Sequence, residues 1–321
     1  MNILLLNKLR DAQGAYLSLE TLGLDAQAVD QDLNALVAFG FLIERHPVFG
    51  VAYRGPAGRL CPDQIEAGLN TLRIGRQVAV WSRIASTNDL AARASRSIAN
   101  EGLVVLAEEQ TAGRGRRGRV WTAPRGTCLL MSVLIFPQGN LAEPGRLTAL
   151  GAIAVAEVVS SYIKSAARIK WPNDVRVNGR KIAGILVERG AGAVIGIGLN
   201  ANVLIDEFPE GLRDTVTSLQ ILTGTPIDRS ILARDLIQKL DALYCRCLAE
   251  GAEILSTLWQ KHSESLGCQV RVMTLRNTFA GTVNQIDPVD GIVLQHADQS
   301  LLHLPASDIL RMVAEDEPEE S

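Results

Sequence analysis

Three glycines, Gly113, Gly115 and Gly118, stand at the spacing G-x-G-x-x-G between two apolar segments of the chain. A dinucleotide-binding fold needs a helix directly after such a motif, because N–H groups at the helix N-terminus bind the pyrophosphate. Here Pro124 and Gly126 follow within eight residues and lead into a second apolar segment, CLLMSVLIFP. The motif also lacks the G-K-[ST] ending of a Walker loop. We therefore predict a loop between two buried strands rather than either nucleotide-binding motif.

Arginines fill the positions around these glycines: Arg114, Arg116, Arg117 and Arg119. Glycine leaves the backbone flexible and the like charges repel one another, so the loop is expected to be mobile without a ligand. Arginine binds phosphate oxygens in pairs, and a polyphosphate or acyl phosphate would order the loop. A solvated basic loop is one alternative. A nucleic-acid patch is another, although such patches usually carry more aromatic side chains than the single Trp121.

The overall charge gives no general attraction to nucleic acid or membrane, because the formal net charge of the 321 residues is −3. Four histidines show no metal-ligand spacing, and the five cysteines are odd in number and form no C-x-x-C. No apolar run reaches the length of a membrane span. These features predict a soluble, cytoplasmic protein with reduced thiols and no membrane partner.

The pattern of the chain changes several times along its length. The first part reads as helix, helix, turn, helix and hairpin, the order of a winged helix-turn-helix. The middle part mixes strands and helices, and the last part is strand and turn throughout, as in a small barrel. We predict the following parts: a winged helix-turn-helix unit at 1–58, a connector at 59–75, a mixed α/β catalytic domain at 76–262, a small β-barrel at 267–314 and an acidic tail at 315–321.

A second cluster of polar residues lies in KWPNDVRVNGRKIAGILVE. The pair Asn178-Gly179 favours a two-residue type I′ turn, which would place Lys181 almost opposite Asp174. A partly buried lysine beside an anion site can stabilise developing negative charge. Asp174 is expected to pair with it or to bind Mg²⁺. The alternative is an ordinary turn that carries a surface lysine.

Two shorter motifs complete the set. The segment STN begins a predicted helix, with Ser86 or Thr87 as its N-cap, and exposed N–H groups there favour polar or anionic ligand groups. Capping alone is the alternative. In GIGLN, Gly196 and Gly198 permit close approach by a ligand or a neighbouring strand.

Taken together and in this order, STN, EEQTAGRGRRGRVW, KWPNDVRVNGRKIAGILVE and GIGLN resemble the biotin–protein ligases, and in particular their bacterial bifunctional type, the biotin operon repressor and biotin–[acetyl-CoA-carboxylase] ligase. The resemblance implies an α+β catalytic domain of the biotin/lipoate ligase type, preceded by a winged helix-turn-helix and followed by an SH3-like barrel. It implies that biotin and ATP, with Mg²⁺, form biotinyl-5′-adenylate. Biotin then passes to a lysine of the biotin carboxyl carrier protein. A homodimer and operator DNA are further partners that it implies.

The resemblance also implies roles for individual residues. Those of the biotin site are Ser86, Thr87, Asn88, Gln110, Arg114, Gly115, Arg116, Lys181, Gly184 and Leu186. Those of the ATP or adenylate side are Arg119, Trp121, Asn173, Asp174 and Asn200, with Asp174 as the Mg²⁺ ligand. Lys181, Arg116 and Arg119 would be the catalytic residues, and Arg311 would couple the C-terminal domain to the site.

The chain departs from the family pattern in two places. A tryptophan that packs on adenine in some bacterial members is replaced by Val216 or Thr217. The helix expected to face DNA carries no lysine or arginine but three aspartates, at Asp25, Asp30 and Asp32, which phosphates would repel. The alternatives are a lipoate–protein ligase and a ligand-sensing DNA-binding regulator without ligase activity.

Overall fold

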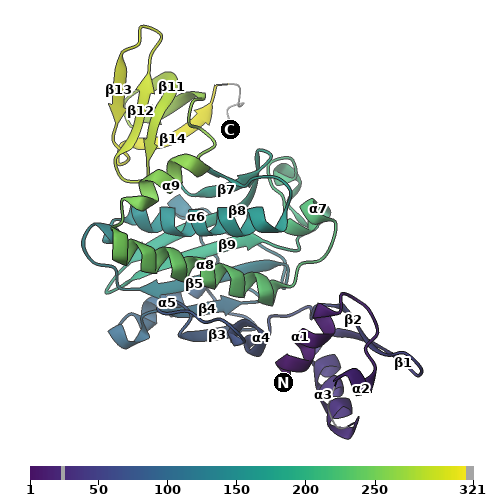
Figure 1. Cartoon of the computed structure of the whole chain (residues 1–321). Helices are drawn as coiled ribbons and strands as arrows, with labels where there is room; N and C mark the ends of the chain where they lie inside the picture. Colours follow the sequence, from purple (N-terminus) through teal and green to yellow (C-terminus); the bar gives the residue numbers. More distant parts are fainter. Residues whose placement is uncertain (23–25, 316–321) are drawn as a thin grey trace.

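The computed structural model describes residues 1–22 and 26–315. Three parts follow one another along the chain: a small helical part with a hairpin, a central part built on a seven-stranded sheet, and a five-stranded C-terminal sheet (Figure 1). The predicted acidic position Asp25 and residues 316–321 of the predicted tail lie outside the described residues.

The N-terminal part has its own apolar core. It contains α1 (Ile3–Asp11), α2 (Leu19–Leu22), α3 (Ala26–Phe39), β1 (Leu42–His46) and β2 (Gly50–Gly55). Leucines of α1 and apolar residues of α3 recur every three or four positions and are buried against one another, as in an amphipathic helix pair. The side chain of Asn2 caps α1 by accepting from the Leu5 N–H at 3.0 Å. The three helices and the hairpin come in the predicted order, while the predicted turn between the second and third helices lies outside the described residues.

The central sheet has the strand order β3-β4-β5-β9-β8-β7-β6. Its strands are β3 (Gln77–Trp81), β4 (Leu103–Ala107), β5 (Cys128–Ile135), β6 (Arg168–Lys170), β7 (Asp174–Val177), β8 (Arg180–Arg189) and β9 (Ala193–Asn200). The pair β3–β4 is parallel, and the other pairs are antiparallel. All eight residues of β5 are buried, because both faces of the sheet are covered there.

Helices cover both faces of this sheet (Figure 1). One face packs against α6 (Pro144–Tyr162) and α8 (Arg229–Glu250), with α9 (Ile254–His262) beside them, while α5 (Thr87–Ala94) packs on β4, β5 and β9. Gly151 of α6 lies close enough to the sheet that a Cβ there would be 3.1 Å from Ile195 and 3.2 Å from Ile185. Two further short helices are α4 (Pro62–Glu66), in the predicted connector, and α7 (Leu219–Thr223), in the central part. In the described part of the chain, no helix combines the length and apolar character needed to cross a bilayer.

The C-terminal sheet is antiparallel throughout, as the strand-and-turn pattern predicts. Its strands are β10 (Gln269–Thr274), β11 (Thr278–Asp287), β12 (Gly291–Gln295), β13 (Leu301–Leu304) and β14 (Ile309–Ala314), in the order β13-β12-β11-β10-β14. The turn between β11 and β12 packs on the start of α6, where a Cβ on Gly145 would lie 2.0 Å from the Pro288 carbonyl oxygen. Arg311 lies on β14, opposite Met273.

Candidate functional site

The face of the central sheet that carries α5 holds the predicted site residues of β8 and β9. The register aligns Ser132 of β5 with Gly196 of β9, and Gly196 with Leu186 of β8. Two residues along the strands, Gly198 lies opposite Gly184. Because side chains alternate along a strand, these five positions share one face. Adjacent glycines on two neighbouring strands leave the backbone of this face uncovered by side chains of its own.

Trp121, which ends the glycine-arginine loop, lies over those glycines. A Cβ on Gly198 would lie 2.6 Å from the indole Cε2 atom, and a Cβ on Gly184 would lie 3.3 Å from Cζ3. A group does approach Gly198 closely, but it is this indole rather than the predicted ligand or neighbouring strand. The indole Nε1–H is buried and has no hydrogen-bond partner within the described residues. A ligand on this face could therefore accept a hydrogen bond from it.

Lys181 reaches the same face through an irregularity in the β7–β8 hairpin. The two turn residues have positive φ, 51° at Asn178 and 76° at Gly179, as a type I′ turn requires. The register pairs Lys181 with Arg176 rather than with Asp174, and it skips Ile182. That extra residue shifts the alternation of side chains by one, so Lys181 joins the face of Gly184.

The ammonium group of Lys181 forms an ion pair with the carboxylate of Asp174. The Nζ–Oδ1 distance is 2.7 Å, and the two side chains are 30% and 25% exposed. The predicted partnership is confirmed, although the register differs from the predicted one. Nζ also lies 5.7 Å from the centroid of the Trp121 ring. A cation held between a carboxylate and an aromatic ring can receive an anionic ligand group at low cost in side-chain ordering.

Residues 215–217 run beside Lys181, where the sequence lacks an aromatic residue. The Lys181 N–H donates to the Thr215 carbonyl at 2.7 Å, and the Thr217 N–H donates to the Lys181 carbonyl at 2.9 Å. Val216 is buried in an apolar cluster with Cys128, Leu130, Val203 and Phe208, against which Trp121 packs. The backbone here is thus held in place by aliphatic packing.

Asn200 connects this segment to β5. Its Nδ2 donates to the Thr217 carbonyl at 3.0 Å, and its Oδ1 lies 3.4 Å from the Cys128 sulfur. Burial raises the pKa of the Cys128 thiol to about 12, so the thiol stays protonated and can donate to Asn200. These two contacts orient the amide and help to fix the loop beside Lys181.

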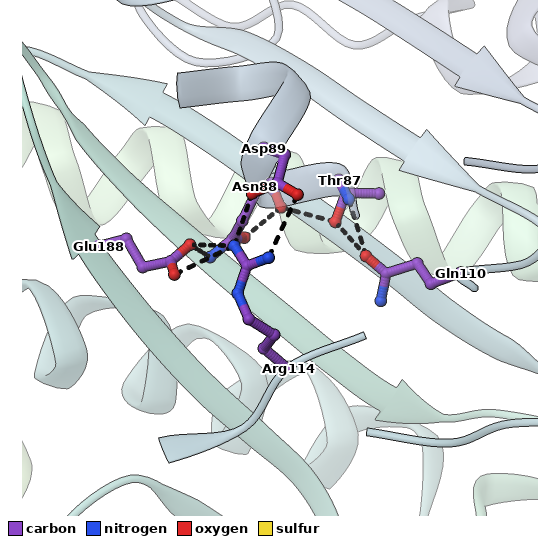
Figure 2. A network of polar contacts seen from close by, with 7 residues as sticks. Thr87, Asn88, Asp89, Gln110, Arg114 and Glu188 are labelled. Atoms are coloured by element: carbon purple, nitrogen blue, oxygen red, sulfur yellow. Dashed lines mark hydrogen bonds and ion pairs between the residues drawn. The ribbon is translucent and has the colours of Figure 1, made fainter. Parts of the chain in front are cut away.

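A polar network, buried at Thr87, Asn88 and Ser132, gathers the STN segment and Gln110 (Figure 2). The Thr87 N–H and hydroxyl both donate to Gln110 Oε1, at 2.7 and 2.9 Å. The Ser132 hydroxyl lies 2.7 Å from Thr87 Oγ1 and 2.5 Å from Asn88 Oδ1. Ser86 occupies the N-cap position of α5, but its side chain makes no capping hydrogen bond. Capping alone therefore does not explain this segment.

Asn88 depends on the glycine beneath it. A Cβ on Gly196 would lie 2.2 Å from Asn88 Oδ1, so only glycine leaves room for this amide. The other end of the amide donates to Glu188 Oε2 at 2.7 Å. A group does approach Gly196 closely, but it is a side chain of α5 rather than the predicted ligand or neighbouring strand.

The glycine-arginine loop folds back on itself and joins the network. The Gly115 N–H donates to the Arg119 carbonyl at 2.7 Å, and the Trp121 N–H donates to the Gly113 carbonyl at 3.0 Å. Arg114 binds Asp89 and Glu188, while Arg116 Nη1 lies 3.5 Å from Asn173 Oδ1. Asn173 in turn donates to the Ile185 carbonyl at 2.9 Å. The structure thus places the loop over the sheet face that carries Lys181 and the glycines.

The predicted residues come together in two groups. The first contains Thr87, Asn88, Gln110 and Arg114, with Ser86 beside them; the second contains Lys181, Asp174, Trp121, Gly184 and Asn200, which Arg116 approaches through Asn173. Leu186 lies between them on β8, and Gly115 and Arg119 lie in the loop above. Both groups occupy one face of one sheet.

Three residues of the network were not predicted: Ser132, Asp89 and Glu188. Ser132 is fully buried and supplies the only hydroxyl in the strand CLLMSVLI, which is a signal that could have identified it. Glu188 ends the apolar run of β8, and Asp89 follows STN directly. Neither carboxylate stands out in the sequence, because its contact with Arg114 depends on tertiary packing.

Comparisons with known proteins identify the family of the chain. A model of the biotin/lipoate A/B protein ligase family matches residues 80–200. A protein of Bacillus spizizenii named bifunctional ligase/repressor BirA is 32% identical over 296 residues, which cover 90% of this chain and 91% of that protein. A Mycobacterium tuberculosis protein named biotin–[acetyl-CoA-carboxylase] ligase is 34% identical over 225 residues, 67% of this chain and 83% of that protein.

Solved structures agree on the fold. The biotin protein ligase from Aquifex aeolicus, solved in complex with biotin and ATP, superimposes with a TM-score of 0.65. The match covers 74% of this chain and 99% of that one at 21% identity, so it supports the mixed α/β fold alone. The similarity to the Bacillus protein extends over nearly the whole length of both chains. The chain therefore belongs to the biotin/lipoate A/B protein ligase family and, within it, to the biotin–protein ligases.

Proposed function

We propose that this protein is an ATP-dependent biotin–protein ligase. In the first half-reaction a biotin carboxylate oxygen attacks the α-phosphorus of ATP, and pyrophosphate leaves. In the second, the amine of a carrier lysine attacks the carbonyl of biotinyl-5′-adenylate, and AMP leaves. The observation that carries this proposal is the position of Lys181, 2.7 Å from Asp174, on the same sheet face as the hydrogen-bonded, uncharged side chains of Thr87, Gln110 and Ser132.

The two groups of residues suit the two ends of such a substrate. The network of Thr87, Asn88, Gln110 and Ser132 offers uncharged donors and acceptors, which fit the polar ring system of biotin better than a charged group. Ser86, Arg114, Gly115, Gly184 and Leu186 complete the proposed biotin site. Lys181 would meet the carboxylate and the α-phosphate, where negative charge accumulates in the first half-reaction.

The loop and the residues beside Lys181 would form the nucleotide side. Arg116 and Arg119 would neutralise the phosphates, and Trp121, Asn173, Asp174 and Asn200 would complete the adenylate site. A mixed anhydride hydrolyses if water reaches it, so a loop that covers the site protects the intermediate until the carrier lysine arrives.

Mg²⁺ would enter this site with ATP. Within the described residues, no group of three or more His, Cys, Asp or Glu side chains could hold a metal ion. Mg²⁺ bound to nucleotides takes most of its ligands from phosphates and water, with one or two carboxylates from the protein. Asp174 fits that single-carboxylate role, because its other partner, Lys181, would turn to the phosphate. The cation would neutralise the leaving pyrophosphate.

Three further assignments accompany this function. The carrier would be the biotin carboxyl carrier protein of acetyl-CoA carboxylase. A second copy of the chain is a further proposed partner, which sedimentation with and without biotin and ATP would test. We place the protein in the cytoplasm, because its five cysteines are all free thiols.

Exchange of radiolabelled pyrophosphate into ATP tests the proposal. We expect exchange that depends on added biotin, followed by transfer of biotin to a carrier domain when one is supplied. Exchange with lipoate but not with biotin would instead identify a lipoate–protein ligase. No exchange with either acid would contradict adenylation altogether.

Operator binding is a second candidate function. It is favoured by the order of elements in the N-terminal part and by the name of the Bacillus relative, which includes a repressor. The charges of α3 oppose it. Asp30 of α3 forms an ion pair with Arg45 of β1, so this arginine of the hairpin is less available to bind DNA phosphates. A gel shift with the biotin promoter of the source organism, run with biotin and ATP, tests it. No shift would leave the ligase proposal intact.

A further inference from the structure

Arg114 connects three segments that are far apart in the sequence. Its Nη1 and Nη2 atoms donate to the two carboxylate oxygens of Asp89 at 3.1 and 2.6 Å, in a bidentate arrangement. Nη2 also lies 3.1 and 3.2 Å from the two oxygens of Glu188. Asp89 belongs to the first turn of α5 and Glu188 to β8. One guanidinium therefore joins the loop to a helix and to a strand (Figure 2).

This contact separates Arg114 from the other arginines of the loop. The hydrogen bonds of Asp89, and then those of Glu188, raise the pKa of Arg114, while the hydrogen bond of Arg114 lowers the pKa of the Asp89 carboxyl. Two carboxylates around one guanidinium leave no positive charge for a ligand phosphate. Arg114 is thus placed to hold the loop, and Arg116 and Arg119 are left to meet phosphates.

The anchoring residues are themselves held in place. Glu188 accepts a hydrogen bond from Asn88 at 2.7 Å, and Asn88 is fixed by Ser132 and by the backbone at Gly196. Asp89 lies one residue further along the same helix, whose rigid backbone fixes its direction. The position of the loop is therefore linked, through Glu188, to Asn88, which is proposed to bind biotin.

We infer that Asp89 is a positioning residue of the ligase: through Arg114 it holds the glycine-arginine loop over the site and so retains the acyl-adenylate. The retention part of this inference rests on the proposed function. The contact between Asp89 and the loop does not, and it can be tested without any substrate.

Limited trypsin digestion of the ligand-free full chain tests the contact. Trypsin cleaves after arginine, and the loop contains Arg114, Arg116, Arg117 and Arg119. In Asp89→Asn, which keeps the size of the side chain and adds no cleavage site, we expect cleavage within 114–119 to be about two- to fivefold faster, the range for losing one exposed ion pair. Asp89→Glu should restore most of the protection. Cleavage at the wild-type rate in Asp89→Asn would overturn the inference.

Glu250→Gln is the matched control. It removes an ion pair with Arg246 on α8 whose side chains are about as exposed, 48% and 52% against 40% and 40% for Arg114 and Asp89. We expect no change in loop cleavage. Equally faster cleavage of the loop in this variant would show that losing an ion pair anywhere makes the chain easier to digest, and would also contradict the inference.

Release of the intermediate tests the second part. With biotinyl-5′-adenylate formed on the protein from labelled ATP, we expect Asp89→Asn to release it about two- to fivefold faster, with the KM for biotin within twofold of wild type. A raised KM with unchanged release would indicate a merely structural effect on the biotin site and would overturn the retention role. If the wild type forms no adenylate, the proposed function fails, while the digestion result still decides the contact.

Discussion

At the scale of single residues, one methyl group added at Gly196 should disturb the proposed biotin site directly. Its φ is not positive, so the backbone would accept alanine. The new Cβ would lie 2.2 Å from Asn88 Oδ1 and would displace the amide from Ser132 and Glu188. Leaving buried polar groups unpaired costs about 1–3 kcal/mol. We predict that Gly196→Ala weakens biotin binding about tenfold or more, as measured by calorimetric titration.

A matched control for this substitution is Gly190→Ala. A Cβ at Gly190, at the end of the β8–β9 hairpin, would meet no atom within 4 Å. That variant should bind biotin as the wild type does. Equal affinities in the two variants would show that Asn88 does not contribute to the biotin site.

Lys181 carries the prediction on chemistry. If it stabilises the charge that accumulates when the carboxylate attacks the α-phosphate, Lys181→Ala should lower biotin-dependent pyrophosphate exchange by about 100-fold or more. The fold should survive, because Lys181 is partly exposed and its backbone hydrogen bonds to residues 215–217 do not involve the side chain. Exchange kinetics check this, with the exposed Lys164→Ala as control. Exchange near the wild-type rate would remove Lys181 from the reaction.

Reasoning from the residues alone found the pair whose contact arises locally, whereas residues with long-range contacts, such as Gln110 and Arg114, came from the family resemblance. Lys181 and Asp174 belong to one hairpin, and a recognisable Asn178-Gly179 turn brings them together. Ser132 and Glu188 reach the site through strand pairing across the sheet, which nothing in the segments themselves reveals. Strand registers between segments far apart in the sequence cannot be predicted from the local pattern of one sequence.

At the scale of elements, the same distinction holds within a single strand. The turn at the start of β8 can be predicted from two residue types, Asn178 and Gly179. The extra residue at Ile182 cannot be predicted in this way, and without it Lys181 would face the opposite side of the sheet. The order β5-β9-β8 could not be predicted either, because β9 follows β8 in the chain yet lies between β8 and β5. The type of most elements was predictable, whereas their arrangement depended on tertiary packing.

The helical layer carries a prediction on pH. Glu157 of α6 lies 3.0 Å from Lys239 of α8 and 3.5 Å from His262 at the end of α9, so it connects three helices. Burial lowers the pKa of His262, although Glu157 opposes this. Burial raises the pKa of Glu157, but Lys239 and His262 outweigh it and the net pKa is lowered. Glu157 therefore stays ionised while His262 titrates.

The direction in which stability changes with pH follows from how many protons the folded and unfolded states bind. Below about pH 6.5, His262 binds a proton more readily in the unfolded chain than in the folded chain. The free energy of unfolding therefore falls as the pH drops from this value toward the lower pKa of the folded state. We predict a lower Tm at pH 5.5 than at pH 7.5, with part of this slope lost in His262→Gln. Thermal unfolding at both pH values checks it. An unchanged slope in the variant would assign the effect to other groups.

At the scale of the whole molecule, a buried ion pair joins the central part to the segment that leads from the N-terminal part. Arg229, at the start of α8, is 4% exposed and lies 2.7 Å from Glu108, which follows β4. The same guanidinium donates to the Gly58 carbonyl at 2.8 Å, and Glu108 accepts from the Leu60 N–H. The connector is thus held by charges of the central part, and the position of the N-terminal part depends on them.

Removing one member of this pair should be costly, because a charge left alone in the interior has no solvent to stabilise it. We predict that Arg229→Met destabilises the chain by about 3–5 kcal/mol, measured by chemical denaturation, and that Glu108→Gln combined with Arg229→Met recovers part of this loss, since no charge is then left unpaired. Arg246→Met, which breaks the exposed pair with Glu250, should cost about 1 kcal/mol or less. If Arg229→Met were no more harmful than Arg246→Met, the pair would not be what fixes the connector, and the two parts would be joined by apolar packing around Leu60 and Cys61 instead.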